Sequence, residues 1–245
     1  MTAAKRTGTP LNQSVERAVK LLGFFSPDEP ELTIAQLTTR LGTSKATTHR
    51  YALALRHVGL LRHDPASGTY TLGPRVVELA ATALAGLRII KIAGPHMERL
   101  VQEVNETVVL SIWDGEAPIV MRVEDNTDRI VRIAVRTGAR LPLDSAQGKV
   151  FAAFNGQIDG HDLSARELAR VRSTRVAVNS RVVEGIRVIA TPVFQEQELV
   201  AAMAIVGTTV GISERSNSPL ALRLIRAAEA LTSELGSLRT NERSG

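Results

Sequence analysis

The sequence predicts an α+β protein built from two domains. Its 245 residues are more than one domain usually needs and enough for two. Apolar residues recur at helical spacing in the first third, whereas runs rich in valine and isoleucine follow from about residue 107. We expect a flexible tail at 1–10, a helical domain at 11–73, a helix at 74–93 and an α+β domain at 94–245.

Composition excludes several classes of protein. Hydrophobic residues make up 44% of the chain and charged residues 22%, a balance typical of ordered globular proteins. The polar, basic stretch Met1–Pro10 lacks the apolar segment of a secretory signal. The longest apolar stretch, Val76–Leu87, contains Glu78 and is shorter than the roughly 20 residues that cross a bilayer. With no cysteine for disulfides or thiolate sites, a cytoplasmic protein without a membrane span is expected.

Charge is distributed unevenly along the chain. Residues 1–75 hold 10 Lys and Arg against 5 Asp and Glu, whereas residues 76–245 hold 20 of each kind. The whole excess of positive charge therefore lies in the first third. Such an asymmetry favours a polyanionic partner, since neutralising phosphates releases counterions. A basic surface that only faces solvent is the alternative.

The first domain begins with three predicted helices. Ser14 is placed to cap the first, whose positions Val15, Ala18, Val19 and Leu22 form one apolar stripe. Thr33 and Gln36 have the spacing of a capping box at the start of the second helix, which ends at Gly42. The third helix is capped by Thr43-Ser44 and ends at Gly59, and its buried face is expected to contain Thr48, Tyr51, Ala52 and Leu55.

A hairpin follows the third helix. Leu60–His63 and Thr69–Leu72 have the composition of short strands, and the loop Asp64–Gly68 between them is rich in turn formers. The order of helix, glycine turn, helix and hairpin is that of a winged helix-turn-helix, in which the second of the two helices enters the major groove of DNA.

The outward face of the third helix is the candidate DNA-binding site. Lys45 and Arg50 can donate hydrogen bonds to phosphates or guanine edges, and Ala46 can contact a thymine methyl group. A helical protein-interaction domain with a basic solvated face is the alternative. The candidate DNA-binding residues are Ser44, Lys45, Ala46, Thr47, His49, Arg50, Arg62 and His63.

The segment Pro74–Ala93 is predicted to form one helix that is apolar on nearly every face. Gly73-Pro74 and Gly94-Pro95 mark its two ends. A helix of this kind must be covered on several sides, so we expect a linker helix that also contacts a partner subunit.

The second domain is predicted to contain one sheet with helices packed against it. Amphipathic helices are expected after Pro95 and over about Pro219–Leu238. The predicted strands are Thr107–Trp113, Ala117–Val123, Arg129–Val135, Ile186–Phe194 and Leu199–Val206.

Several motifs together resemble one family. Ser14–Val19, Leu32–Leu37, Lys45–Arg50 and Tyr70–Pro74 are similar to the DNA-binding domain of IclR-type bacterial transcriptional regulators. Further motifs are similar to the effector-binding domain of that family and follow in the same order, so the resemblance covers about the whole chain; they are Pro142-Leu143, Ser145–Lys149, Glu184–Phe194 and Ala201–Gly207.

The resemblance implies a homodimer or a dimer of dimers that binds a palindromic double-stranded DNA operator. It also implies a GAF-like C-terminal domain, with a central antiparallel sheet, that binds a small-molecule effector. Repression is the expected role, and an activator of the same architecture or a constitutive DNA-binding protein without an effector are the alternatives. The residues implied to bind the effector are Leu143, Ser145, Ala146, Gln147, Gly148, Asn179, Val188, Ala204 and Val206.

The expected effector is partly apolar or aromatic. Gln147, Val178-Asn179, Ala204 and Val206 depart from the family's usual small, acidic or hydroxyl-bearing residues. A cavity that is also edged by Leu143, Val188, Met203 and Ile205 is mostly apolar, with Gln147 and Asn179 as its polar contacts.

An enzyme is not expected. The sequence contains no nucleophile elbow, Walker loop, paired-histidine zinc spacing or dinucleotide fingerprint. Its five histidines are scattered, so neither a metal site nor a cofactor is expected.

Overall fold

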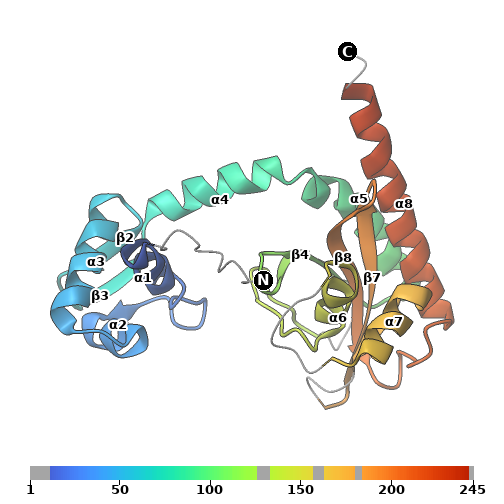
Figure 1. Cartoon of the computed structure of the whole chain (residues 1–245), viewed down its shortest axis with the longest axis horizontal. Coiled ribbons are helices and arrows are strands. Elements are labelled where there is room, and N and C mark those ends of the chain that lie inside the picture. Colours follow the sequence, from blue (N-terminus) through green and yellow to red (C-terminus); the bar gives the residue numbers. More distant parts are fainter. Residues whose placement is uncertain (1–11, 126–132, 157–162, 180–183, 243–245) are drawn as a thin grey trace, which may run out of the picture. The chain divides into compact units, whose positions relative to one another are not determined.

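The computed structural model describes residues 12–125, 133–156, 163–179 and 184–242. The chain divides into two compact units, Met1–Gly86 and Leu87–Gly245. Each unit has its own antiparallel sheet, of three strands in the first and five in the second (Figure 1). The predicted α+β class with a central antiparallel sheet is therefore confirmed.

The described part of the first unit, residues 12–86, holds four helices, and the caps of the second and third follow the sequence. Thr33 and Gln36 form the predicted capping box, in which the Thr33 amide donates to Gln36 Oε1 at 2.8 Å. Gly42 ends that helix with φ at 67°, and Ser44 Oγ accepts from the Thr47 amide at 3.2 Å to begin the next. The helices are α1 (Gln13–Leu22), α2 (Ile34–Leu41), α3 (Lys45–His57) and α4 (Pro74–Gly86).

The predicted hairpin is present as β2 (Leu61–Asp64) and β3 (Thr69–Leu72). A two-residue strand, β1 (Leu32–Thr33), pairs with the other side of β3 and was too short to predict from a pattern. At the exit of the hairpin Gly73 lies against the end of α3, where a Cβ on Gly73 would be 2.1 Å from the Gly59 carbonyl oxygen. The amide of Arg75 donates to that same oxygen at 3.2 Å, so the start of α4 is bonded to the end of α3.

The prediction for α1 is wrong in two respects. Asn12 rather than Ser14 caps the helix, since Asn12 Oδ1 accepts from the Ser14 amide at 3.1 Å. Val15 and Val19 are 58% and 61% exposed, whereas Leu21 is fully buried. Ala18 and Leu22 of the predicted stripe do pack against the core beside Leu21, so the predicted face is right for these two residues and wrong for Val15 and Val19.

The single helix predicted over Pro74–Ala93 is also wrong. The chain leaves the helical conformation at Leu87, between α4 and α5 (Arg88–Val104). Pro95 lies inside α5 and does not mark a boundary. Gly94 lies against the Arg122 guanidinium instead, and a Cβ there would be 2.7 Å from Arg122 Nη2, so that side chain would have to move.

The five-stranded sheet of the second unit has the order β5-β4-β8-β7-β6. Four of the five predicted strand regions form strands, and β6 was not predicted. For the fifth, Arg129–Val135, residues 133–135 are not in a strand and residues 129–132 lie outside the described ranges. The strands are β4 (Thr107–Trp113), β5 (Pro118–Glu124), β6 (Ala177–Asn179), β7 (Ile186–Gln195) and β8 (Glu198–Thr208).

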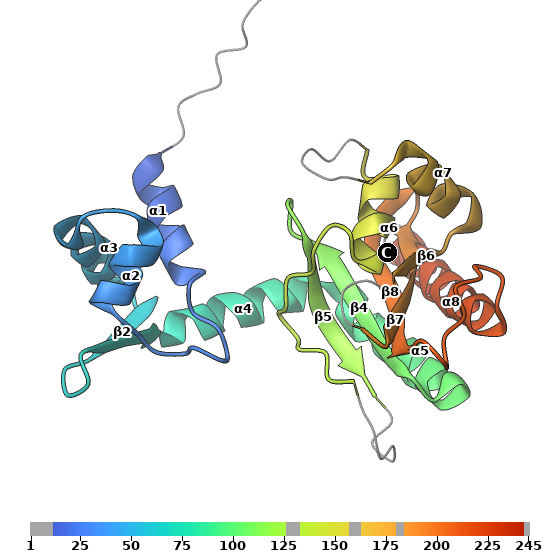
Figure 2. The same cartoon turned by 90° about the horizontal axis from the view of Figure 1, so that it is seen from below.

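Helices cover both faces of this sheet (Figure 2). On one face lie α5 and α8 (Pro219–Glu242); on the other lie α6 (Ala146–Phe154) and α7 (Ala165–Thr174). Side chains alternate between the two faces along each strand. None of the described helices is long and apolar enough to span a membrane.

Candidate functional site

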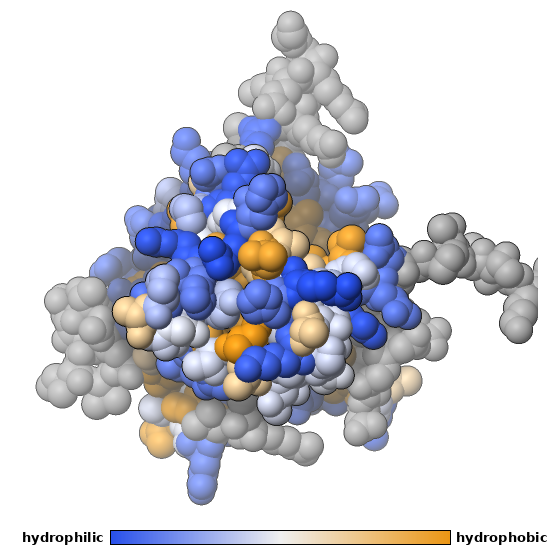
Figure 3. Space-filling view, turned by 90° about the vertical axis from the view of Figure 1, so that its left-hand side faces the viewer, coloured by the Kyte–Doolittle hydropathy of each residue, from blue (hydrophilic) through white to orange (hydrophobic). Residues whose placement is uncertain are grey.

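The outward face of α3 is the first candidate surface. Thr48, Ala52 and Leu55 are buried against the rest of the unit, as predicted. This packing leaves Lys45 and Arg50 exposed on the opposite side, together with Ala46 and His49, whereas Thr47 is half-buried. Figure 3 views the side of the molecule formed by the first unit and shows mostly hydrophilic residues with separate hydrophobic spots.

Three side chains of this face that can donate hydrogen bonds are available to a ligand. Lys45, His49 and Arg50 make no side-chain hydrogen bond or ion pair with another described residue. Ser44 is already engaged, since its hydroxyl donates to Thr47 Oγ1 at 3.0 Å and accepts from the Thr47 amide. Ser44 therefore fixes the first turn of the helix.

Tyr51 connects α3 to α1. Hydrogen bonding with Ser14, opposed by burial and supported by hydrogen bonding with Arg17, lowers the pKa of its phenol. The charges of Arg17 and Arg50 act in the same direction. The phenol thus helps to hold the orientation of α3 in the unit.

The hairpin presents one available cation. Arg62 is exposed and makes no side-chain bond with another described residue, whereas the His63 ring packs 4.7 Å from the Tyr70 ring. The turn is held by Asp64, whose carboxylate accepts from the Ala66 amide and the Ser67 hydroxyl, both at 2.9 Å. These bonds lower the pKa of Asp64.

Sequence reasoning missed the second half of this helix face. A hollow of about 570 Å³ is lined there by Arg50, Leu53, Ala54, Arg56 and His57. Leu53 is 52% exposed. The spacing of Arg50, Leu53 and His57 at i, i+3 and i+7 could have revealed that the exposed face continues to the end of α3.

The start of α6 is the second candidate surface. Ser145 caps the helix, with its hydroxyl accepting from the Gly148 amide at 3.0 Å. A Cβ on Gly148 would be 2.3 Å from the Leu143 carbonyl oxygen, so only glycine fits. Asn179 Nδ2 donates to the Asp144 carbonyl at 2.7 Å and thereby joins β6 to this turn. The residues predicted around this turn are therefore adjacent.

The sheet beneath α6 brings the other predicted residues together. Val188 is the register partner of both Asn179 and Val206, and Ala204 pairs with Val109 on β4. Met203 and Ile205 belong to the core on the opposite face, so their predicted place at the cavity edge is wrong. Strand alternation excludes them once Ala204 faces α6.

Small side chains cover the sheet where it faces α6. Ala177, Ala190, Ala202 and Ala204 lie in this core cluster, and Ser111 is the register partner of Ala202. Ser111 is fully buried, and its hydroxyl has no hydrogen-bond partner among the described residues. The sequence around a single serine in a strand does not indicate that its hydroxyl will be buried without such a partner.

The polar groups near α6 are neutral or already paired. Lys149 Nζ pairs with Glu167 at 2.7 Å and donates to the Val178 carbonyl at 3.1 Å. Gln147 is 4% exposed, and its side-chain amide forms no hydrogen bond with a described residue. Within the described ranges no group of three or more His, Asp or Glu side chains could hold a metal ion.

Comparison with protein families matches both parts of the chain. The IclR helix-turn-helix domain matches residues 14–65, and the bacterial transcriptional regulator IclR C-terminal domain matches residues 81–163. Among curated relatives, the HTH-type transcriptional regulator XynR of Escherichia coli is 29% identical over 93% of this chain and 98% of its own length. The DNA-binding transcriptional repressor YiaJ of E. coli is 28% identical over 92% of this chain and 88% of its own.

Solved structures share the fold. An IclR homolog from Microbacterium hydrocarbonoxydans, solved in complex with 4-hydroxybenzoate, has a TM-score of 0.74 at 24% identity and covers 91% of this chain and 99% of its own. The IclR transcriptional regulator of Alicyclobacillus acidocaldarius has a TM-score of 0.75 at 22% identity, with coverages of 93% and 99%. The chain therefore belongs to the IclR family of DNA-binding transcriptional regulators, with the helix-turn-helix domain of that family followed by its C-terminal domain.

Proposed function

We propose that the exposed face of α3 and the hairpin form the operator-binding surface. The observation that carries this proposal is the set of three unpaired side chains, Lys45, His49 and Arg50, opposite the buried face of one helix. Donors in this arrangement suit phosphates and base edges in a major groove. The proposed interface contains Ser44, Lys45, Ala46, Thr47, His49, Arg50, Arg62 and His63, with Ser44 positioning the helix and His63 packing on Tyr70.

The operator is palindromic in this proposal, and the protein binds it as a homodimer or a dimer of dimers. Val77, Leu79 and Leu84 are exposed on α4, as are Val15 and Val19 on α1. Apolar side chains of this size in water support coverage by a second copy. Two symmetric copies would place two α3 helices on two half-sites.

The effector binds on the α6 side of the sheet in this proposal, among the nine residues predicted from the sequence. The strand surface there includes four alanines, and Ser111 and Gln147 supply neutral polar groups. Because Lys149 is paired, the site suits a partly apolar or aromatic ligand with few charges. The 4-hydroxybenzoate in the structural neighbour is a ligand of this kind.

Repression in the cytoplasm, relieved by the effector, is the regulatory action proposed. The relative YiaJ is a repressor, which supports this role. Relief by the effector requires the effector to bind the DNA-free arrangement of the protein more tightly than the DNA-bound one. Activation by the same architecture is the second candidate. No catalytic activity is part of the proposal.

A binding titration tests the DNA surface. Duplexes selected from a random pool on the wild-type protein are titrated by fluorescence anisotropy at several salt concentrations. We expect Arg50→Ala to weaken binding by about tenfold and to reduce the salt slope by about one, because one phosphate contact is lost. Arg166→Ala, an exposed arginine on α7, is the matched control. An unchanged affinity and slope for Arg50→Ala would contradict the proposal.

A further inference from the structure

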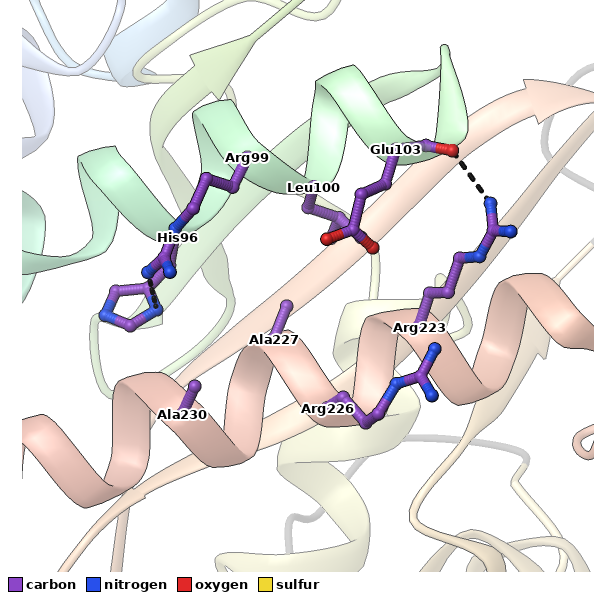
Figure 4. Close-up of a pocket in the computed structure, with 8 residues that line it drawn as sticks. All are labelled: His96, Arg99, Leu100, Glu103, Arg223, Arg226, Ala227 and Ala230. Carbon is purple, nitrogen blue, oxygen red and sulfur yellow. Dashed lines mark hydrogen bonds between the residues drawn. The ribbon is translucent and has the colours of Figure 1, made fainter.

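A pocket between α5 and α8 of the second unit is lined by three arginines that belong to neither proposed surface. It has a volume of about 290 Å³ and lies on the side of the sheet opposite α6. Figure 4 shows Arg223 and Arg226 of α8 toward one end, Arg99 of α5 toward the other, and the Glu103 carboxylate between them. Leu100 and Ala227 add apolar lining.

Arg99 is held in place by its neighbours. Its Nε donates to the Pro95 carbonyl at 3.2 Å, and its Nη2 lies 3.1 Å from His96 Nδ1. Since a guanidinium can only donate, His96 Nδ1 accepts this bond, which leaves Nε2 to donate to Glu234 Oε2 at 2.7 Å. His96 is buried, so this chain of bonds fixes Arg99 at its end of the pocket.

The other two arginines form the second end. Arg223 Nη1 donates to the Glu103 carbonyl at 2.7 Å, and Arg226 makes no hydrogen bond or ion pair with a described residue. None of the three pairs with a carboxylate within the described ranges. Elsewhere in the same unit, Arg122 pairs with Glu124 at 2.7 Å and Arg187 with Glu214 at 2.9 Å. With three arginines and one glutamate in its lining, the pocket carries an excess of positive charge, and none of these arginines is paired with a carboxylate among the described residues.

The order of charges along the pocket defines a ligand class. Two adjacent guanidiniums suit a phosphate group, which offers three acceptor oxygens and nearly two negative charges. Glu103 would repel a uniformly anionic molecule but can accept a hydrogen bond from a hydroxyl. At the opposite end of the pocket, Arg99 can donate hydrogen bonds to a second acceptor group of the ligand, such as a carboxylate. The volume is near the lower limit for small-molecule sites.

We propose that this pocket binds a small phosphorylated hydroxy acid, with its phosphate at Arg223 and Arg226, its hydroxyl at Glu103 and its carboxylate at Arg99. The ligand bridges α5 and α8. The site is independent of the proposed effector face, from which the five-stranded sheet separates it.

Calorimetric titration of the full chain with 3-phosphoglycerate tests the proposal. We expect one saturable site, with about tenfold weaker binding of glycerol 3-phosphate, which lacks the carboxylate. Arg226→Ala should weaken both ligands by about tenfold. Arg99→Ala should weaken only 3-phosphoglycerate and so remove the preference between them. Arg166→Ala is the matched control and should bind both ligands as the wild type does.

Three results would overturn the proposal. The first is the absence of saturable binding of 3-phosphoglycerate. The second is equal binding of inorganic sulfate, which would indicate attraction of any anion. The third is an unchanged affinity in Arg226→Ala and Arg99→Ala when thermal melting shows that both variants fold. None of these results bears on operator binding or on the α6 face.

Discussion

The two faces of the five-stranded sheet are built from different side chains. Toward α5 and α8 the strands present Leu110, Ile189, Met203 and Ile205, all fully buried. Toward α6 the buried strand side chains are four alanines, three valines and Ser111, whose hydroxyl has no hydrogen-bond partner among the described residues. One face thus fills its layer with large apolar groups, whereas the other carries smaller side chains and a polar atom. In our proposal the first face supplies stability and the second binds the effector.

The largest expected effect comes from the filled face. Leu110→Ala should lower the free energy of unfolding by about 3 kcal/mol, because it leaves a cavity in a tightly packed layer. Ala204→Val, an enlargement of a fully buried alanine on the other face, should cost less, about 1 kcal/mol, since the neighbouring strand residues Ala190 and Ala202 are small. Urea denaturation of both variants measures the contrast. Equal losses would mean that the two faces are packed alike.

Gly148 offers a test at the turn before α6. Gly148→Ala should cost about 2 kcal/mol, because the new methyl group overlaps the backbone carbonyl of Leu143 and the turn must move. It should also abolish any melting-temperature increase caused by aromatic monocarboxylates. Gly236→Ala on α8 is the control, because a Cβ at Gly236 meets open space. Gly156→Ala is unsuitable, since φ at Gly156 is positive. Full stability in Gly148→Ala would show that the turn adapts.

The smallest expected change in stability is at Ser111. Here the substitution should not destabilise the protein, in contrast to the two predictions above. Ser111→Ala should leave stability unchanged or raise it by about 1 kcal/mol, because it removes a buried hydroxyl that has no hydrogen-bond partner among the described residues. Thermal melting without ligand measures this change. Thr191→Ala is the comparison, because the Thr191 hydroxyl donates to the Arg175 carbonyl at 2.8 Å and its loss should destabilise. A clear loss of stability in Ser111→Ala would mean that the hydroxyl has a structural role.

Local chemistry explains which parts of the fold the sequence predicts. The capping box of Thr33 and Gln36, the glycine end at Gly42 and the hairpin depend on neighbours within a few residues, and all three are present. The buried side of α1 and the break at Leu87 depend on packing against distant segments, which a periodic pattern does not contain. The exposed side of α3 can be predicted from the helical spacing of its residues. The burial of the Ser111 hydroxyl depends instead on three strands coming together.

The bond between the start of α4 and the end of α3 has a mechanical consequence. Gly73 can lie against the Gly59 carbonyl oxygen only because Gly73 has no side chain, and the Arg75 amide donates to that same oxygen. The first turn of α4 is therefore fastened to the residues that directly follow α3. At its other end α4 stops before Leu87, which provides no side-chain cap for α5. A rotation of α4 would therefore act on the segment that follows α3 directly as well as through the hairpin.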